Sequence, residues 1–404
     1  MSDLIDTDIL VSGGGVAGLT AAVAFGQAGF NVICVDPAAP IMTREAAGAD
    51  LRTTAFLQPA RAFLERIGLW GRLAPYATPL QVMRIVDAGG ETTEPRASHD
   101  FDAADIGELP FGWNLPNWLL RREMVAAIGD LPNVDFRPGT GTAQVLTRQA
   151  EARVTLSDGA RIRARLIIGA DGRDSFVRKS ANIPVKTTRY GQKALAFAVS
   201  HAIPHNNVST EIHRTGGPFT LVPLPDHEGR PSSAVVWMER GPEAQRLTDL
   251  EVTDFEGEMS ERSGYLFGPL TLISRRTIWP IISQTAGRMS AERIALVAEA
   301  AHVLPPIGAQ GLNMSLADLG TLLDLAELDR DGLGNHKMLT AYHRARHAEI
   351  LARVVGIDAL NRASMVDAQV LRDLRMRALN AFYGVAPVRR ALMRAGLGAR
   401  DIQK

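Results

Sequence analysis

The run Ser12–Gly18 (Ser-Gly-Gly-Gly-Val-Ala-Gly) constrains the fold most, because it places a glycine-rich turn between an apolar strand and an Ala-rich helix. Residues Asp8–Ser12 are predicted to form the strand and Leu19–Ala28 the helix. A second apolar strand at Val32–Val35 ends at Asp36. A strand, a helix and a second strand in this order form a βαβ unit with a right-handed crossover. The chain is therefore predicted to open with an α/β, Rossmann-like unit.

The glycines of this turn, Gly13, Gly15 and Gly18, form a G-x-G-x-x-G pattern. The first glycine permits a tight turn, the second lets the backbone approach a pyrophosphate, and the third lets the helix pack closely on the strand. Val16 and Ala17 lie in this turn, and the helix that follows directs free N–H groups and a positive dipole end at the phosphates.

Asp36 lies 21 positions after Gly15, at a strand end where an acid can bond a ribose hydroxyl. In this setting the pattern predicts a bound dinucleotide, and it leaves the choice between FAD and NAD open. The alternative is a glycine turn that only packs a bare βαβ unit.

A second motif follows an apolar strand predicted over Arg163–Ile168. Asp171 and Gly172 lie at the end of that strand, and Ser175 and Arg178 lie on the next helical turn. These side chains can contact phosphates or brace the first glycine turn. An Asp-Gly pair is also common in ordinary turns, so that interpretation stays open.

A third motif, Ala298–Asn313, repeats the order of strand and loop. A strand predicted over Arg293–Val297 leads to Glu299 and His302. We expect His302 to hold the loop by bonding backbone groups and assign it no proton transfer.

The second half of this motif has the composition of a loop that accepts a planar ligand. Pro305-Pro306 rigidifies it, and Gly308 and Gly311 let the backbone come close. Leu312 and Asn313 are predicted to begin a helix whose free N–H groups can stabilise negative charge.

The remaining pattern predicts two further regions. Short apolar or alternating runs broken by Pro and Gly over Lys193–Glu239 predict an antiparallel sheet that forms a second lobe. A helical pattern covers Thr54–Ile67, and another runs from Leu316 onward with a break at Gly332–Asn335.

Composition excludes several classes of protein. The chain has 404 residues, 46% of them hydrophobic, which suits a globular protein of two lobes. Lys+Arg and Asp+Glu both total 44, which gives no electrostatic case for nucleic acid. The one cysteine, Cys34, excludes an internal disulfide and fits a reducing compartment. Without a basic leader or a stretch of about 18 to 20 apolar residues, we expect a cytoplasmic protein and assign no metal ligands.

The C-terminal segment is basic, with eight Arg and one Lys against three Asp from residue 361 to the end. Apolar residues are interleaved with these charges. A basic amphipathic helix can lie on the inner, anionic face of a membrane or on a biosynthetic partner. A solvated helix packed on the body of the protein is the alternative.

Together the three motifs resemble those of the single-component FAD-dependent aromatic hydroxylases, the family of p-hydroxybenzoate hydroxylase, over nearly the whole chain. They match the ADP-binding turn, the Asp-Gly motif and the Gly-Asp-Ala-Ala-His motif with its flavin loop. Segments similar to the ubiquinone-biosynthesis hydroxylases are Asp50–Phe56, Leu64–Trp70, Phe219–Pro225 and Gln310–Asp318. One departure is Ala298-Glu299, where the family has Gly-Asp; the Glu side chain is a methylene longer, and we expect FAD binding to survive.

The motifs and the resemblance predict a set of cofactor-binding residues: Gly13, Gly15, Val16, Ala17, Gly18, Asp36, Arg52, Asn117, Arg121, Asp171, Gly172, Glu299, Gly311, Leu312 and Asn313. Pro305 and Gly308 are predicted to shape the flavin pocket, with no acid or base assigned. The resemblance implies a discontinuous FAD-binding domain, an inserted substrate-binding sheet and a C-terminal helical region. Their predicted ranges are 1–77, 100–182 and 275–340 for the first, 78–99 and 183–274 for the second, and 341–404 for the third.

The resemblance also implies an activity, hydroxylation of a prenylated phenol ring in ubiquinone biosynthesis. NAD(P)H would bind transiently and reduce FAD, O₂ would add to give a C4a-hydroperoxide, and its distal oxygen would pass to the ring. A flavin reductase of isoprenoid double bonds is one alternative. A flavin-fold binding protein without chemistry is another, and the Ala298-Glu299 departure is the feature that favours it.

Overall fold

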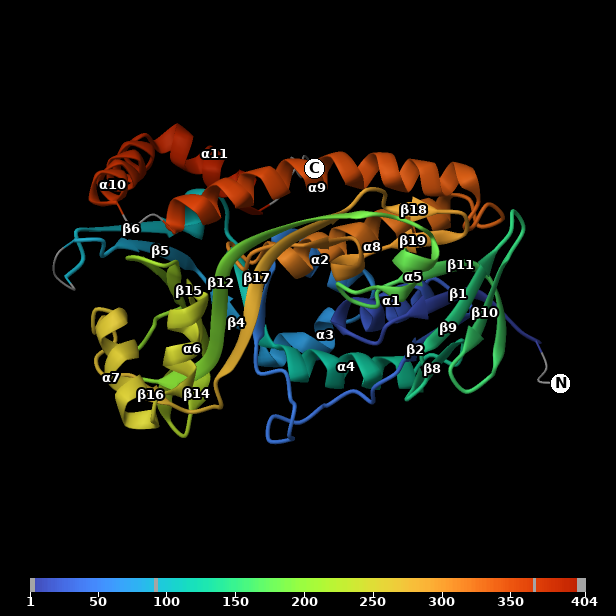
Figure 1. Cartoon of the computed structure of the whole chain (residues 1–404), viewed down its shortest axis with the longest axis horizontal. Helices are drawn as coiled ribbons and strands as arrows, with labels where there is room; N and C mark the ends of the chain where they lie inside the picture. The colour runs from blue at the N-terminus through green and yellow to red at the C-terminus, as the bar shows by residue number, and fades with distance from the viewer. Residues whose placement is uncertain (1–3, 91–93, 366–367, 398–404) are drawn as a thin grey trace.

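The computed structural model describes residues 4–90, 94–365 and 368–397, which build two large sheets connected by helices (Figure 1). One sheet carries the glycine turn, and the other forms the second lobe. The long helix α9 (His336–Ser364) runs along both of them. The predicted α/β class, with a Rossmann-like unit, a second sheet and a helical C-terminal region, is confirmed.

The first sheet has eight strands in the described residues, in the order β18-β19-β11-β1-β2-β8, with the hairpin β9–β10 joined to β11. Its central pairs are parallel. Its strands are β1 (Leu4–Ser12), β2 (Val32–Asp36), β8 (Val134–Pro138), β9 (Thr142–Thr147), β10 (Ala152–Leu156), β11 (Arg161–Gly169), β18 (Ser290–Ala291) and β19 (Ile294–Leu296). Because Ser12 pairs with Gly169, the glycine turn and the Asp171 loop lie at the same sheet edge.

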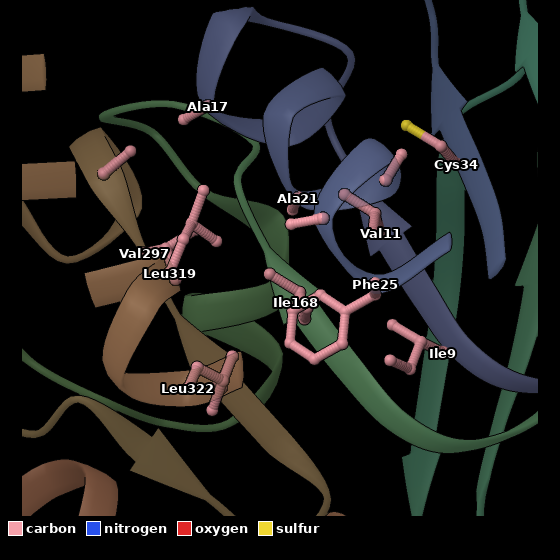
Figure 2. Packing of buried hydrophobic residues seen from close by; sticks show 14 of the residues in the cluster. Ile9, Val11, Ala17, Ala21, Phe25, Cys34, Ile168, Val297, Leu319 and Leu322 are labelled. Carbon is pink, nitrogen blue, oxygen red and sulfur yellow. The ribbon is translucent and has the colours of Figure 1, made fainter. Parts of the chain in front are cut away.

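Helix α1 (Val16–Gln27) is buried over most of its length, since it packs against this sheet, α4 (Asn117–Gly129) and α8 (Gln310–Leu328). A helix enclosed on all sides needs small apolar residues rather than an amphipathic pattern, which explains its Ala-rich sequence. Figure 2 shows part of this core, with Ile9, Val11, Ala17, Ala21, Phe25, Cys34, Ile168, Val297, Leu319 and Leu322 labelled.

The second sheet has nine strands in the described residues, in the order β20-β17-β12-β15-β14-β13-β5-β6, with β16 paired to β12. Its strands are β5 (Val82–Asp87), β6 (Ala97–Asp102), β12 (Val185–Ser200), β13 (Val208–His213), β14 (Pro218–His227), β15 (Arg230–Arg240), β16 (Thr271–Leu272), β17 (Thr277–Ala286) and β20 (His302–Val303). The predicted antiparallel lobe is confirmed by its main strand pairs, although β13 and β5 run parallel.

The helix predicted over Thr54–Ile67 is wrong in its first part. Strand β3 (Thr53–Leu57) pairs with β7 (Gly112–Pro116), and helix α2 begins only at Gln58 and ends at Arg66. Two adjacent β-branched threonines favour the extended backbone, and a distant partner strand completes the pairing. Strand β4 (Thr78–Leu80) adds to β7 and finishes a small third sheet.

The predicted helical pattern after Leu316 corresponds to α8 and α9, and the break falls where expected, at Asn335, whose side chain accepts a hydrogen bond from the Met338 N–H. Residues 366–367 and 398–404 of the predicted C-terminal region lie outside the described residues. The other helices are α3 (Trp70–Leu73), α5 (Phe176–Ser180), α6 (Gly241–Asp249), α7 (Val252–Arg262), α10 (Gln369–Gly384) and α11 (Ala386–Leu397), with 3₁₀ turns at Ala74–Tyr76, Ala103–Asp105 and Ala298–Ala300. None of the described helices combines the length and apolar character needed to cross a membrane.

The division into domains stays a prediction, and the sheet pairing bears on its edges. Strand β6 of the second sheet extends past the predicted edge at residue 99. Strand β17 falls within the predicted range 275–340 of the first domain, yet it pairs with β12 in the second sheet.

Candidate functional site

The three glycines of the first turn have different surroundings. Gly13 has a φ of +110°, and a Cβ there would lie 2.3 Å from the Ala170 carbonyl oxygen. A Cβ on Gly18 would lie 1.8 Å from the Gly13 carbonyl oxygen, so packing alone demands these two glycines. A Cβ on Gly15 would meet no atom within 4 Å. The middle glycine therefore opens onto space that the protein itself does not fill, which is the cradle a pyrophosphate requires.

Helix α1 begins at Val16, three positions before the predicted start at Leu19, so Val16 and Ala17 lie in its first turn, where N–H groups have no partner within the helix. Asp36 ends β2, as predicted. Its carboxylate accepts hydrogen bonds from Gly14 N at 2.6 Å and Ala38 N at 2.8 Å. These bonds fix its orientation and leave further lone pairs for a ribose hydroxyl.

The Asp171 loop braces the first glycine turn. Ala170 N donates to Ser12 O at 2.8 Å, and Gly172 has a φ of +80°. The Asp171 carboxylate accepts from Ser175 Oγ and from Val177 N, so it holds the start of α5. The sequence predicts two roles for this motif, phosphate contact and bracing of the first glycine turn. These contacts are those that bracing requires.

Asp50 organises a cluster that joins three of the predicted site residues. Its carboxylate accepts two hydrogen bonds from Arg52, at 2.8 and 2.7 Å, and one from Asn117 Nδ2 at 3.1 Å. Arg121 Nη2 lies 3.7 Å from the same carboxylate. Burial acts to raise the pKa of Asp50, but the Arg52 and Asn117 hydrogen bonds and the nearby charges outweigh it and lower that pKa. The sequence does not single out Asp50 as a site residue; it only begins the segment Asp50–Phe56 that resembles the ubiquinone-biosynthesis hydroxylases.

Arg52, directly before β3, also contacts the second sheet. Its guanidinium lies 5.5 Å from the ring centroid of Trp279 on β17. The hydrogen bond to Asp50 raises the pKa of Arg52, and the charge of Glu299 adds to the effect. Segments far apart in the sequence therefore place Arg52 among Asp50, Trp279 and Glu299.

Glu299 and the residue before it depart from the family pattern in residue type. The Glu299 side chain is half exposed, and Arg173 Nε lies 3.9 Å from its carboxylate. Ala298 has a φ of +54°, in the left-handed region that favours glycine. The backbone at Ala298 thus has a conformation that favours glycine, although the chain carries alanine there.

Residues 305–309, which we call the flavin loop, lead directly into α8. The helix begins at Gln310, two positions before the predicted start at Leu312. Gly308 and Ala309 both adopt positive φ, at +63° and +55°. A Cβ on Gly311 would meet nothing within 4 Å. The first turn of α8, whose N–H groups have no partner within the helix, therefore borders open space at Gly311.

Asn313 uses its side chain to hold α8 against β3. Its Oδ1 accepts from Leu57 N at 2.8 Å, and its Nδ2 donates to Ala55 O at 2.8 Å. The amide thereby pairs with β3 much as a neighbouring strand would. This contact was not predicted, because it joins residues more than 250 positions apart in the sequence.

The prediction that His302 bonds backbone groups with its side chain is wrong. Its Nε2 lies 2.6 Å from Asp318 Oδ2, and the other Asp318 oxygen accepts from Arg346 Nε at 2.8 Å. A buried imidazole needs a polar partner, and the carboxylate on α8 supplies one. His302 still supports the loop, through α8 and α9 rather than through the main chain.

An apolar cluster separates the flavin loop from the second sheet. Ile307 of the loop packs with Ala194, Met238 and Ile281, which come from three neighbouring strands of that sheet. The partly buried members of the cluster are Tyr190, Val236 and Trp279. The arrangement brings an apolar, aromatic sheet face against the flavin loop, beside Arg52.

Comparison with known proteins agrees with this geometry. A family described as FAD binding domain matches residues 6–355. The chain is 34% identical to the ubiquinone hydroxylase UbiL of Rhodospirillum rubrum, over 97% of this chain and 89% of that protein. It is 26% identical to the 3-demethoxyubiquinol 3-hydroxylase of Escherichia coli, over 97% and 98%.

Solved structures share the fold. The p-nitrophenol 4-monooxygenase PnpA of Pseudomonas putida superposes with a TM-score of 0.81 at 19% identity, over 99% of this chain and 100% of that one. PqsL of Pseudomonas aeruginosa, solved with 2-aminobenzoylacetate, gives 0.76 at 22% identity, over 90% and 97%. The chain belongs to the FAD-dependent aromatic hydroxylase family, in the subgroup that contains these ubiquinone hydroxylases.

Proposed function

We propose that this protein is an FAD-dependent monooxygenase that hydroxylates the aromatic ring of a prenylated phenol in ubiquinone biosynthesis, with NAD(P)H as reductant and O₂ as oxidant. The names of its relatives support the pathway. The observation that carries the proposal is the apolar cluster between Ile307 of the flavin loop and the second sheet. A ring and prenyl chain need such a surface next to a flavin, since both are apolar.

We assign the cofactor to the edge where the three motifs meet. Gly13–Gly18 and Asp36 would hold the ADP half, and Asp171, Gly172 and Glu299 the middle of the molecule. Arg52, Asn117 and Arg121 would approach it from the Asp50 cluster, and Gly311, Leu312 and Asn313 from the start of α8. In the proposed domain division, this edge belongs to the FAD-binding domain and most of the second sheet to the substrate domain, while β17 and β20 fall in the range 275–340 of the first. When bound and reduced, FAD supplies the activated oxygen atom that enters the ring.

The protein's own part is to position the ring and exclude water. Pro305 and Gly308 shape the flavin loop, and Ile307 closes it against the sheet. No acid or base is assigned, since an electron-rich phenol activates its own ring. Tyr190, the titratable member of the cluster, fits this view: burial and Asp358 raise its pKa to about 12, so it stays protonated at neutral pH.

The test is product analysis with purified protein, FAD, NAD(P)H, a short-chain prenylphenol and ¹⁸O₂. We expect a product with one more ring oxygen, and that oxygen carries the label. A product that has gained hydrogen without the label identifies a reductase and overturns the proposal. A protein that takes up no FAD overturns it as well.

We further propose that the basic C-terminal helices contact an anionic lipid surface, where a prenylated substrate would reside. The exposed cationic side chains in the described part of α9, α10 and α11 are Lys337, Arg344, Arg362, Arg377, Arg390 and Arg394. Two acids on these helices are already paired, Asp358 with Arg362 and Asp373 with Arg96. Exposed apolar side chains lie on the same helices, at Leu351, Val355, Leu360, Leu374, Val388 and Leu392, and Val385 lies between α10 and α11. Basic and apolar side chains together favour adsorption to an anionic bilayer.

Sedimentation with vesicles tests this contact. We expect the protein to pellet with phosphatidylglycerol-containing vesicles, less so at high salt, and not with pure phosphatidylcholine. Arg390→Glu combined with Arg394→Glu should release it, whereas Arg163→Glu, on β11 of the first sheet, should not. If the Arg390→Glu/Arg394→Glu variant and the Arg163→Glu control bound the vesicles equally, the assignment to these helices would be contradicted.

A further inference from the structure

Gln310, the first residue of α8, joins the flavin loop to two other parts of the chain. Its Nε2 donates to Gly308 O at 2.8 Å and to Gly396 O of α11 at 3.1 Å. Its Oε1 accepts from Arg353 Nη1 of α9 at 2.7 Å. The side chain is buried, and all of its polar atoms are engaged. The loop therefore cannot move away from α9 and α11 unless this amide loses hydrogen bonds.

Arg353 continues the connection to the other end of the flavin loop. It pairs with Glu349 at 3.3 Å, and Glu349 pairs with Arg346 at 2.6 Å. Arg346 donates to Asp318, which binds His302. His302 precedes the flavin loop and Gln310 follows it, so an unbroken chain of polar contacts clamps the loop at both ends.

Helix α11 is the least enclosed part of this arrangement. Among its described side chains, only Met393 and Leu397 are buried, while Val388 and Leu392 are exposed. Apart from Gln310, Arg389 anchors its first half by an ion pair with Asp105 at 3.0 Å. A helix held by so few contacts can detach locally without unfolding the sheets.

We propose that Gln310 is a positioning residue that couples the docking of α11 to the conformation of the flavin loop. Gly308 and Ala309 hold left-handed backbone conformations, which for Ala309 are costly and need support from neighbouring contacts. When α11 detaches, the Gln310 amide loses one acceptor, its bond to Gly308 is free to reorient, and the loop relaxes. Any surface that binds α11 then regulates the loop. The consequence for hydroxylation rests on the proposed function, but the coupling itself does not.

Hydrogen–deuterium exchange in the full-length, FAD-free protein tests the coupling. Leu397→Asp puts an unpaired charge at a buried position and should detach α11, and Leu392→Asp is the matched control at an exposed position of the same helix. We expect Leu397→Asp to speed exchange in peptides covering 386–397 and, roughly two- to tenfold, in those covering 303–314. Leu392→Asp should change neither.

Gln310→Met removes the hydrogen bonds that join the loop to α9 and α11, because the thioether is of similar length and replaces none of the amide hydrogen bonds. In this variant, exchange in 303–314 should already be fast, and adding Leu397→Asp should change it little. Should Gln310→Met fail to fold, Gln310→Glu retains the acceptor for Arg353 and loses both donors, with the same expectation. Independent, additive effects of Gln310→Met and Leu397→Asp would overturn the coupling, as would an unchanged loop when α11 is detached.

The FAD-loaded protein provides a separate readout. Gln310→Met should alter the visible absorption or circular dichroism of bound FAD, in addition to any loss of stability from its missing hydrogen bonds. An unchanged spectrum in the folded variant would show a purely structural role for Gln310 and would contradict the proposal. If wild-type protein takes up no FAD, the proposed function fails, and the exchange experiment still decides the coupling.

Discussion

The imidazole of His302 and the carboxylate of Asp318 lie 2.6 Å apart in the interior, with side-chain exposures of 1% and 0%. Arg346 donates to the same carboxylate and is itself buried. Burial acts to lower the pKa of Arg346, but Asp318 outweighs it and raises that pKa above its usual value. Asp318 is thus the shared anion that permits both a histidine and an arginine beneath the flavin loop.

Asp318→Asn should therefore destabilise the protein strongly. The substitution leaves the Arg346 charge buried without its main partner, and breaking a buried pair from one side costs about 3–5 kcal/mol. Urea unfolding measures the loss. Asp324→Asn on the same helix is the control: Asp324 is 61% exposed in its pair with Arg66, so less than ~1 kcal/mol is expected. Equal losses for the two variants would contradict the role given to Asp318.

Ala298 should accept glycine better than its neighbour Ala300 does. Ala298 has a φ of +54°, a conformation that costs an L-residue about 1–2 kcal/mol, whereas Ala300 has no such strain and is fully buried. We expect Ala298→Gly to be more stable than Ala300→Gly by about that amount in urea unfolding. If both variants lose the same stability, the left-handed backbone at Ala298 is not a source of strain.

The longer acid at Glu299 should still serve the cofactor. A charge-assisted hydrogen bond contributes about 1.5–3 kcal/mol, so Glu299→Gln should weaken FAD binding roughly 10- to 100-fold in a fluorescence titration. Glu299→Asp should restore the affinity to within about threefold, because the carboxylate is kept. The control is Glu292→Gln, at an exposed acid between β18 and β19. Wild-type affinity in Glu299→Gln would remove this residue from the cofactor site.

The sequence was sufficient to predict those parts of the fold that local pattern determines. A strand, a glycine turn and an Ala-rich helix follow one another without a gap, so the βαβ unit at Gly13–Gly18 is fully specified by neighbouring residues. The same holds for the antiparallel strands between 193 and 239. In contrast, β3 depends on β7, nearly 60 positions away, and propensity alone could not distinguish it from the start of α2.

The site shows the same division. The glycine-rich and Asp-Gly motifs are recognised from the spacing of neighbouring residues, so their positions could be predicted from the sequence. Asp50 and Asp318 could not be predicted, because the role of each acid depends on hydrogen-bond partners from other elements. Asn117 is 67 residues from Asp50, and Arg346 is 28 from Asp318. A lone acid in a sequence is most often solvated, and whether it is buried next to an arginine depends on the tertiary structure.

The buried His201 should make the second lobe sensitive to acid. Its ring bonds Ile203 O at 2.8 Å and Ser233 Oγ at 3.0 Å and stacks on Phe267. Burial lowers the pKa of His201, and the nearby His205 and Arg230 act in the same direction, against Asp226 and the Ile203 carbonyl.

Because the folded pKa lies below the unfolded value of about 6.5, the unfolded chain binds more protons between the two. Stability should be fully present above about pH 6.5 and should fall as the pH drops toward the folded pKa. Unfolding free energies of wild type and His201→Gln, measured across that window, should converge as the pH falls. The exposed His336→Gln is the control. A constant difference between wild type and His201→Gln would contradict a neutral, buried imidazole.

Gly15 and Gly18 should separate cofactor binding from folding within a single turn. A Cβ on Gly15 meets no protein atom within 4 Å, and its φ of −70° suits any residue, so Gly15→Ala should unfold like the wild type. If the pyrophosphate occupies that space, the methyl group should reduce FAD affinity by about tenfold or more.

A Cβ on Gly18 would instead lie 1.8 Å from the Gly13 carbonyl oxygen, which forces helix and strand apart. Gly18→Ala should therefore lose about 1–3 kcal/mol of stability even without cofactor. Thermal unfolding and FAD titration of both variants give opposite rankings if this assignment holds, and undiminished FAD binding by Gly15→Ala would place the cofactor elsewhere.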